Sequence, residues 1–229
     1  MALPMNAQVD PRDVYAQARF NMIEQQIRPW DVLDPRVLDC LFAAKREEFV
    51  PADSRLLAFA DLELPLPTGG HMLAPRVEAR LLQALDVQPD DAALEIGTGS
   101  GYLTALLANM ARHVYSVDLS AQASEIAAAS LARNGVRNVT LSVGNGIDGD
   151  SKHAPFNVIV LGGSVPEMPE QLKTQLAPGG RLVAVVGEAP AMQAVLITRG
   201  EGDNFREEVL FETVVEPLAQ VKVPSRFVF

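Results

Sequence analysis

Leu94-Glu95-Ile96-Gly97-Thr98-Gly99-Ser100-Gly101-Tyr102 is the stretch that decides the fold of this chain. It joins a short apolar run of strand character, residues 92–96, to an Ala- and Leu-rich segment of helical character, residues 102–110. Glycines at such a junction let the backbone turn sharply and approach a ligand, with the N–H groups of the helix facing it. The stretch therefore predicts a strand, a tight turn and a helix that together bind a ligand.

Beyond this stretch, short apolar runs alternate with helical segments. The second helix, expected over residues 122–133, ends at Asn134-Gly135, a favoured helix stop. Strand, helix and strand in this order imply right-handed parallel crossovers with helices on both faces of a doubly wound α/β sheet. The last two runs have no helix-length insert between them, so we expect an antiparallel hairpin at one edge. The expected strands are residues 92–96, 113–117, 139–143, 156–161, 180–186, 194–199 and 209–214.

The first part of the chain reads as helices and one long loop. Asp34 is a good N-cap and Pro35 suits the first helical position, so a helix is expected there, and another over residues 75–85. The segment between them, residues 49–75, is mostly aperiodic and carries four prolines and Gly69-Gly70, as a functional loop does. We expect residues 1–75 to form a helical N-terminal cap with an active-site loop, and residues 76–229 to form the ligand-binding α/β domain, in one compact unit. The apolar end, residues 223–229, reads as a tethered tail.

Composition excludes several classes of protein. The 229 residues carry 19 Lys and Arg against 29 Asp and Glu, a net charge of −10, which gives no electrostatic basis for nucleic-acid binding. The start of the chain lacks a basic and then apolar leader, and no apolar run reaches the roughly 18 residues of a membrane span. We expect a soluble, cytoplasmic protein. The single cysteine, Cys40, excludes an internal disulfide and a multi-cysteine metal site, and we expect it in the core and no metal centre.

An acidic residue follows the glycine loop at the spacing that nucleotide-binding sheets use for a ribose contact. Asp118 lies about twenty residues on, at the end of the second expected strand, where a carboxylate can accept hydrogen bonds from two ribose hydroxyls. The glycine spacing is G-x-G-x-G, and Tyr102 stands where a dinucleotide motif has its third glycine. This spacing favours an adenosyl ligand without a pyrophosphate over NAD. The alternative is a tight turn in which Asp118 only caps the next helix, as Ser120 could also do.

From about Leu41 to Gly187 the sequence resembles the protein-L-isoaspartate O-methyltransferases, a class of S-adenosylmethionine-dependent enzymes. The resemblance implies a seven-stranded class I methyltransferase sheet (Rossmann-like), S-adenosyl-L-methionine as cofactor, and a protein or peptide acceptor methylated on the carboxylate of isoaspartyl residues. The segments that carry it are KREEFVP (45–51), AFADLELPLP (58–67), LEIGTGSGY (94–102), GNG (144–146), APFN (154–157) and QLAPGGRLVAVVG (175–187).

The resemblance also implies site residues. The cofactor is expected over the glycine loop, with Asp118 on its ribose and the Gly144-Asn145-Gly146 segment beside the adenine. Asn145 stands where the family usually has Asp, and its side-chain oxygen can still accept from an adenine amino group. The cofactor-binding residues implied are Met72, Leu73, Glu95, Gly97, Thr98, Gly99, Gly101, Asp118, Leu119, Asn145 and Gly146.

The chain departs from the family pattern at the expected active-site loop. Family members typically carry a G-Q-T-I-S-x-P-like segment, whose hydroxyl is tied to activity; aligned on Pro75, this chain has Leu73 at the hydroxyl position and His71 at the threonine. Leucine offers no hydrogen bond. His71 could compensate by holding a carboxylate as imidazolium or by acting as a base, or it could be an ordinary loop histidine. Asp61 could face the site or anchor the loop.

These departures leave three readings of function. One is isoaspartyl methylation, a second is methyl transfer to a different acceptor shaped by Leu73 and His71, and a third is a non-catalytic protein that only binds the cofactor. The other two histidines, His113 and His153, read as structural or solvated.

Overall fold

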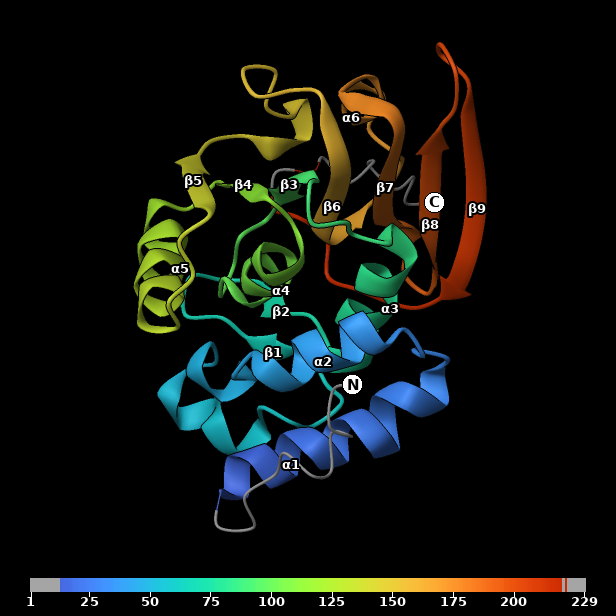
Figure 1. Ribbon diagram of the computed structural model, residues 1–229. Coiled ribbons are helices and arrows are strands. Elements are labelled where there is room, and N and C mark those ends of the chain that lie inside the picture. Colours follow the sequence, from blue (N-terminus) through green and yellow to red (C-terminus); the bar gives the residue numbers. More distant parts are fainter. Residues whose placement is uncertain (1–12, 220, 222–229) are drawn as a thin grey trace, which may run out of the picture.

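The computed structural model describes residues 13–219 and residue 221 (Figure 1). The terminal segment 223–229, expected to be a tethered tail, lies outside the described residues. Six α-helices are described: α1 (Val14–Met22), α2 (Pro35–Ala43), α3 (Pro75–Leu85), α4 (Tyr102–Met110), α5 (Ala121–Arg133) and α6 (Glu170–Thr174). Short helical turns are η2 (Ile23–Ile27), η3 (Arg28–Trp30), η4 (Arg46–Glu48), η5 (Ala52–Leu57) and η6 (Gly146–Asp148).

A seven-stranded sheet forms the centre of the fold. Its strand order is β5-β4-β3-β6-β7-β8-β9, and β3 to β7 run parallel. The antiparallel edge hairpin expected from the sequence is confirmed as β8 with β9, and β8 is antiparallel to β7 as well. The strands are β3 (Ala92–Ile96), β4 (His113–Asp118), β5 (Val139–Val143), β6 (Phe156–Val165), β7 (Leu176–Glu188), β8 (Ala191–Arg199) and β9 (Phe205–Glu212).

Five of these strands differ in extent from the sequence-based expectation. β4 ends one residue later, β8 begins three residues earlier, and the other three differ more. The strands β6 and β7 are longer than expected because they continue through the glycines at 162–163 and 179–180, which a propensity reading treats as strand ends. β9 begins earlier and ends earlier, since Phe205 and the three charged residues at 206–208 pair with β8 at the edge of the sheet. A small antiparallel sheet, β1 (Leu64–Pro65) with β2 (His71–Met72), was not expected within the long loop.

Local sequence explains where the helices begin. The Asp34 side chain accepts a hydrogen bond from the Arg36 N–H, with Pro35 at the first helical position, as expected. Ser120 caps α5 by accepting from the Ala123 N–H. Each such cap contributes about 1 kcal/mol of stability. The helices expected over residues 75–85 and 102–110 have those bounds in the structure.

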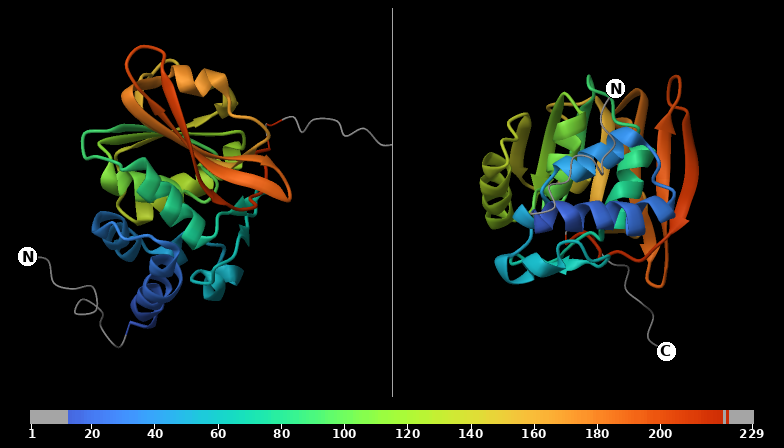
Figure 2. Two further views of the ribbon diagram at one scale, coloured as in Figure 1. Left: turned by 90° about the vertical axis from the view of Figure 1, so that its right-hand side faces the viewer. Right: turned by 60° about the horizontal axis from the view of Figure 1, so that its bottom comes forward.

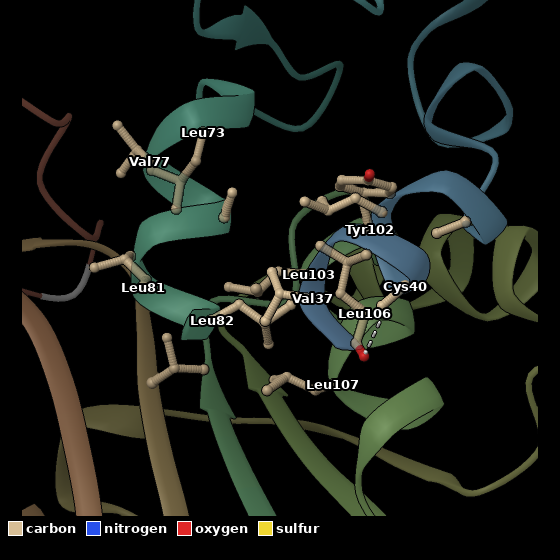
Figure 3. Packing of buried hydrophobic residues seen from close by; sticks show 14 of the residues in the cluster. Val37, Cys40, Leu73, Val77, Leu81, Leu82, Tyr102, Leu103, Leu106 and Leu107 are labelled. Atoms are coloured by element: carbon tan, nitrogen blue, oxygen red, sulfur yellow. Dashed lines mark hydrogen bonds between the residues drawn. The ribbon is translucent and has the colours of Figure 1, made fainter. Parts of the chain in front are cut away.

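An apolar layer lies on each face of the sheet, and Figure 2 shows how the helices are arranged around the sheet. Helices α3 and α4 cover one face, and α2 of the cap packs on both of them. Figure 3 shows this layer, in which Val37 of α2, Leu82 of α3 and Leu106 of α4 converge. Cys40 lies in the same layer with its Sγ near the Leu106 carbonyl, so its expected core position is confirmed, and burial raises the pKa of its thiol to about 12. The opposite face is covered by α6 and by residue Leu218.

Candidate functional site

A cavity of about 270 Å³ lies at the carboxyl ends of the central strands. Its walls are the turn after β3, the end of β4, the glycines of β6, the β1–β2 hairpin and residues 215–219. The connection that leaves β3 runs to β4 and the connection that leaves β6 runs to β7, in opposite directions along the sheet. Open α/β sheets bind ligands at such a switch point. Of the expected cofactor-binding residues, Gly97, Gly99, Asp118 and Leu119 line this cavity.

The glycine turn has the conformation that its sequence predicts. Gly97, Gly99 and Gly101 all have positive φ, at 91°, 51° and 82°. Gly97 and Gly99 line the cavity with backbone. The side chains of Leu218 and Leu66 lie against this backbone, because a Cβ would come 2.9 Å from Leu218 at Gly97 and 3.1 Å from Leu66 at Gly99. Gly101 serves a different purpose, since a Cβ there would lie 3.1 Å from the Ala127 Cβ of α5.

Asp118 holds the turn and still has capacity to bind. One carboxylate oxygen accepts from the Gly99 N–H at 3.0 Å, and the other accepts from the Ser120 N–H at 2.8 Å. An ionised carboxylate has about four acceptor positions, so each oxygen retains one for a hydroxyl of a ligand. Capping of α5 falls to Ser120, which leaves Asp118 directed at the cavity it lines.

Glu95 lies deeper, beside a second cavity of about 30 Å³. Its Oε2 accepts from Thr104 Oγ1 at 2.5 Å and from Ser116 Oγ at 2.7 Å, while its buried Oε1 has no hydrogen-bond partner. Thr98, which lines this cavity, shares a hydrogen bond with Ser116. Burial raises the pKa of Glu95 to about 8, so the side chain is largely protonated at neutral pH.

A buried arginine ties the cap to the loop that ends at α3. Arg46 is fully buried; its Nε donates to the Ala58 carbonyl at 2.9 Å and its Nη2 to the Leu73 carbonyl at 2.7 Å. Its Nη1 pairs with Glu78 of α3, whose pKa burial raises to about 7, and its guanidinium lies over the Tyr102 ring at 4.8 Å. The backbone of residue 73 is therefore held in place from the core side.

Leu73 occupies the expected hydroxyl position and is only 5% exposed. Its side chain belongs to the apolar layer shown in Figure 3, close to Val77. Met72 is buried as well, and both residues line the 30 Å³ cavity beside Glu95. At this position the structure thus presents hydrocarbon to the site, where the family usually presents a hydroxyl.

His71 lies at the mouth of the larger cavity and borders the smaller one. Its Nδ1 contacts Oε2 of Glu216, which follows β9. Glu63, beside β1, lines the same cavity, and its pKa is raised by burial, lowered by the His71 charge and raised by Glu216. Two ionisable side chains of the hairpin region, Glu63 and His71, therefore meet the distant Glu216 at the mouth. Among the described residues, no group of three or more His, Cys, Asp or Glu is arranged to hold a metal ion.

Other expected site residues lie outside both cavities. Asn145 caps η6: its Oδ1 accepts from the Ile147 N–H and its Nδ2 donates to Asp148. Gly146 packs on the end of β3, where a Cβ would come within 2.6 Å of Ile96. The segment does adjoin the site, because the Gly144 N–H donates to the Asp118 carbonyl at 2.9 Å.

Asp61 anchors the long loop to α3. Its Oδ2 pairs with Arg76 at 2.9 Å, and the Arg76 guanidinium stacks over Trp30 at 4.1 Å. The remaining histidines both contact the Tyr115 ring: His153 stacks on it and His113 is tilted against it. His113 is bonded to Thr140 and His153 to Asp150.

Sequence reasoning did not single out several residues of this site. Gly162 and Gly163 follow an apolar run in β6, so their position at the end of a strand was a usable signal. Glu216 carries no local signal, since only the path of the chain after β9 brings it to His71. Glu63 lies inside a family-like segment that offers several acidic residues.

Comparison with known proteins places this geometry in a family. The model of the family described as "Protein-L-isoaspartate(D-aspartate) O-methyltransferase (PCMT)" matches residues 17–221. The protein-L-isoaspartate O-methyltransferase of Koribacter versatilis is 37% identical over 204 residues, which cover 89% of this chain and 91% of that protein. The enzyme of the same name from Rhodopseudomonas palustris (strain ATCC BAA-98 / CGA009) is 40% identical over 190 residues, 82% of this chain and 87% of the relative.

Solved structures agree on the fold. A protein-L-isoaspartate O-methyltransferase superposes with a TM-score of 0.76 at 24% identity, over 87% of this chain and 65% of that chain. A putative protein-L-isoaspartate O-methyltransferase from Plasmodium falciparum, solved with S-adenosyl-L-homocysteine, gives a TM-score of 0.74 at 19% identity, over 90% and 98% of the two chains. At these identities the likeness is one of fold, and it agrees with the expected class I methyltransferase sheet.

None of the helices that the structure describes is long and apolar enough to cross a membrane.

Proposed function

The chain belongs to the protein-L-isoaspartate(D-aspartate) O-methyltransferase family, and we propose that it transfers a methyl group from S-adenosylmethionine to the free carboxylate of isoaspartyl residues in damaged proteins. In this reaction an O–CH₃ bond forms and an S–CH₃ bond breaks, giving a methyl ester and S-adenosylhomocysteine. The observation that carries the proposal is the cavity at the strand ends, where the glycine turn and Asp118 meet the loop that bears His71.

The residues present fit this cofactor. The backbone of Gly97 and Gly99 lines the cavity, and the Asp118 carboxylate keeps an acceptor position on each oxygen, which suits a pair of ribose hydroxyls. The unpartnered Oε1 of Glu95 lies deeper in the same region. We assign Gly97, Gly99, Asp118 and Leu119 to cofactor binding. When bound, S-adenosylmethionine supplies an electrophilic methyl group.

The protein's own task is to position the acceptor and exclude water. An isoaspartyl carboxylate is ionised at neutral pH, so it needs no general base. Orientation and desolvation therefore account for most of the acceleration. Of the described residues that line the larger cavity, none is Lys or Arg, and His71 is the side chain there that can carry positive charge. As imidazolium it donates a hydrogen bond to the acceptor carboxylate, in place of the hydroxyl that Leu73 lacks.

Calorimetry and a peptide assay test this function. The unchanged chain should bind S-adenosylhomocysteine and should form base-labile methyl ester on an isoaspartyl peptide, and the same peptide with an ordinary aspartate is the control. If the chain does not bind S-adenosylhomocysteine at high micromolar concentration, it is not a methyltransferase. If it binds the ligand but methylates no isoaspartyl peptide, the proposed isoaspartyl acceptor is wrong.

One observation favours a second acceptor class. Leu73 presents hydrocarbon, and a histidine paired with a carboxylate resembles a base for an acceptor that carries a proton, such as a hydroxyl. Leu73→Ser discriminates between the two. Robust turnover of isoaspartyl peptide by the unchanged chain would reject the second class, whereas turnover gained only in the variant would support it.

The proposed function also implies a partner for the reaction and a place in the cell. A protein or peptide is the acceptor, and a net charge of −10 makes nucleic acid an unfavourable partner. The single cysteine is buried and free, which accords with action in the reducing cytoplasm. Fractionation of cells that express the chain tests this location.

A further inference from the structure

The segment Val215–Leu218, which we call the C-terminal strap, is bonded to the end of β6. Ser164 makes all three hydrogen bonds: its N–H donates to the Glu216 carbonyl at 2.9 Å, its carbonyl accepts from Leu218 at 3.0 Å, and its Oγ donates to the Val215 carbonyl at 2.8 Å. Two of these bonds flank the Glu216 backbone. The backbone that carries the Glu216 side chain is therefore fixed relative to the sheet.

The strap also packs on the glycine turn. A Cβ placed on Gly97 would lie 2.9 Å from Leu218 Cδ2, and one placed on Gly163 would lie 3.0 Å from the same atom. Leu218 is buried in the layer on that face of the sheet. The strap is thus one wall of the cavity, with one residue turned to the core and Glu216 turned to the mouth.

Across the mouth, Glu216 contacts Nδ1 of His71. The Glu216 and His71 side chains are 44% and 41% exposed. Their contact therefore restricts the conformation of each side chain more than the surrounding packing does. A carboxylate at Nδ1 accepts the proton of that nitrogen and leaves Nε2 as the other hydrogen-bonding atom of the ring. The charged groups that line the cavity with them are Glu63 from the β1 side and Asp118 from β4.

We propose that Glu216 is a positioning residue for the methyl acceptor and acts through His71. It holds Nδ1, and Nε2 of the imidazolium then donates to the acceptor carboxylate. Three carboxylates line the cavity and would repel an anionic acceptor, so the orientation of His71, the side chain among the described lining residues that can carry positive charge, governs binding of the acceptor. This proposal rests on the proposed function and adds to it a residue that lies after the last strand.

A double-mutant cycle tests the proposal. The variants are Glu216→Ala, Glu216→Gln, His71→Gln and the Glu216→Ala/His71→Gln double variant, with Glu207→Ala on the exposed edge strand β9 as the matched control. KM and kcat for an isoaspartyl peptide are measured, together with the thermal midpoint. Removing a charged hydrogen-bond partner should raise KM about tenfold in Glu216→Ala and change kcat much less. Glu216→Gln should raise KM only about threefold, because its amide oxygen still accepts from Nδ1–H.

The double-mutant cycle shows whether Glu216 acts through His71 or independently of it. If Glu216 acts through His71, adding Glu216→Ala to the His71→Gln chain changes KM less than about twofold, since the coupling is already lost. A second readout is the ¹⁵N NMR spectrum of the neutral His71 ring, which should show the Nδ1–H tautomer in the unchanged chain and lose it in Glu216→Ala.

Three results would overturn the proposal. These are an unchanged KM in Glu216→Ala, the same loss in both His71 backgrounds, and a tautomer that does not respond to Glu216. A chain that binds S-adenosylhomocysteine but methylates no isoaspartyl peptide would overturn the proposed function and this proposal together. An active chain that is insensitive to Glu216 would overturn this proposal alone.

Discussion

Replacing Gly162 by alanine should weaken cofactor binding, because the added Cβ would press against the glycine turn from β6. Gly162 lies in β6, and a Cβ built there comes 2.7 Å from the Gly97 carbonyl oxygen and 3.4 Å from that of Ile96. Ordinary contacts begin at 3.4 Å, so the Gly97 peptide has to move by about 0.7 Å. The obstructing atom is backbone, which cannot rotate away as a side chain can. Overpacking of this size costs about 1–3 kcal/mol.

That cost falls on the turn that binds the cofactor. Gly97 is also bonded through its N–H to the Val117 carbonyl at 2.8 Å, so the turn cannot shift without straining the link to β4. If the whole penalty appears in binding, Kd for S-adenosylhomocysteine rises roughly 5- to 150-fold. Isothermal calorimetry measures this Kd, and a thermal melt reports how much of the penalty goes into folding.

A matched control separates the clash from a general effect of alanine. Gly200→Ala places a Cβ 3.5 Å from the Asn204 carbonyl oxygen, an ordinary contact in the β8–β9 turn, so its Kd should stay within twofold of the unchanged chain. A Gly162→Ala chain that binds as tightly as this control and melts at the same temperature would refute the reasoning, because the close approach of β6 to the turn would then have no consequence.

Three further predictions follow from the same geometry. Asp118→Asn loses an acceptor for either the Gly99 or the Ser120 N–H and should weaken S-adenosylhomocysteine binding by about 1.5–3 kcal/mol in calorimetry; unaltered affinity would contradict this. Leu73→Ser removes a buried side chain and should lower the free energy of unfolding by about 2–4 kcal/mol in urea titration, whatever it does to activity; a loss below 1 kcal/mol would mean the pocket refills. Because the pKa of Glu95 is raised to about 8 on folding, its stabilising contribution is complete below its unfolded pKa of about 4.5 and is lost as the pH rises to 8. Urea unfolding at pH 5 and pH 8 should therefore show that the free energy of unfolding falls more between these pH values for the unchanged chain than for Glu95→Gln. An equal fall in both chains would exclude titration of Glu95 as its cause.

The sequence was sufficient for the parts of the site that depend on local rules. Positive φ at Gly97 and Gly99, the end of β4 at Asp118 and the cap at Ser120 each follow from residue type and neighbours. The antiparallel edge likewise follows from the short connection between the last two strands. Such features need no knowledge of what is distant along the chain.

Other parts depend on contacts between distant segments. Asp61 anchors the long loop through Arg76 of α3, a partner that the local sequence does not identify, and the contact of Glu216 with His71 spans 145 positions. β6 extends beyond Gly162 because Ser164 and Val165 pair with β7 after a register shift at the glycines, and this pairing outweighs the low strand propensity of glycine. Local pattern gives no access to these contacts, because they arise only when the sheet and the loops have assembled.

The buried Arg46 has a consequence for how a large substrate reaches the site. Its bond to the Leu73 carbonyl and its pairing with Glu78 fasten the inner end of the hairpin to the core. Gly69 and Gly70, at the outer end, have positive φ and open space around them. Any widening of the entrance must therefore pivot about the fastened end, with the glycine tip making the largest excursion. A damaged polypeptide would thus be admitted from the outer side of the hairpin, past Gly69 and Gly70, which line the cavity.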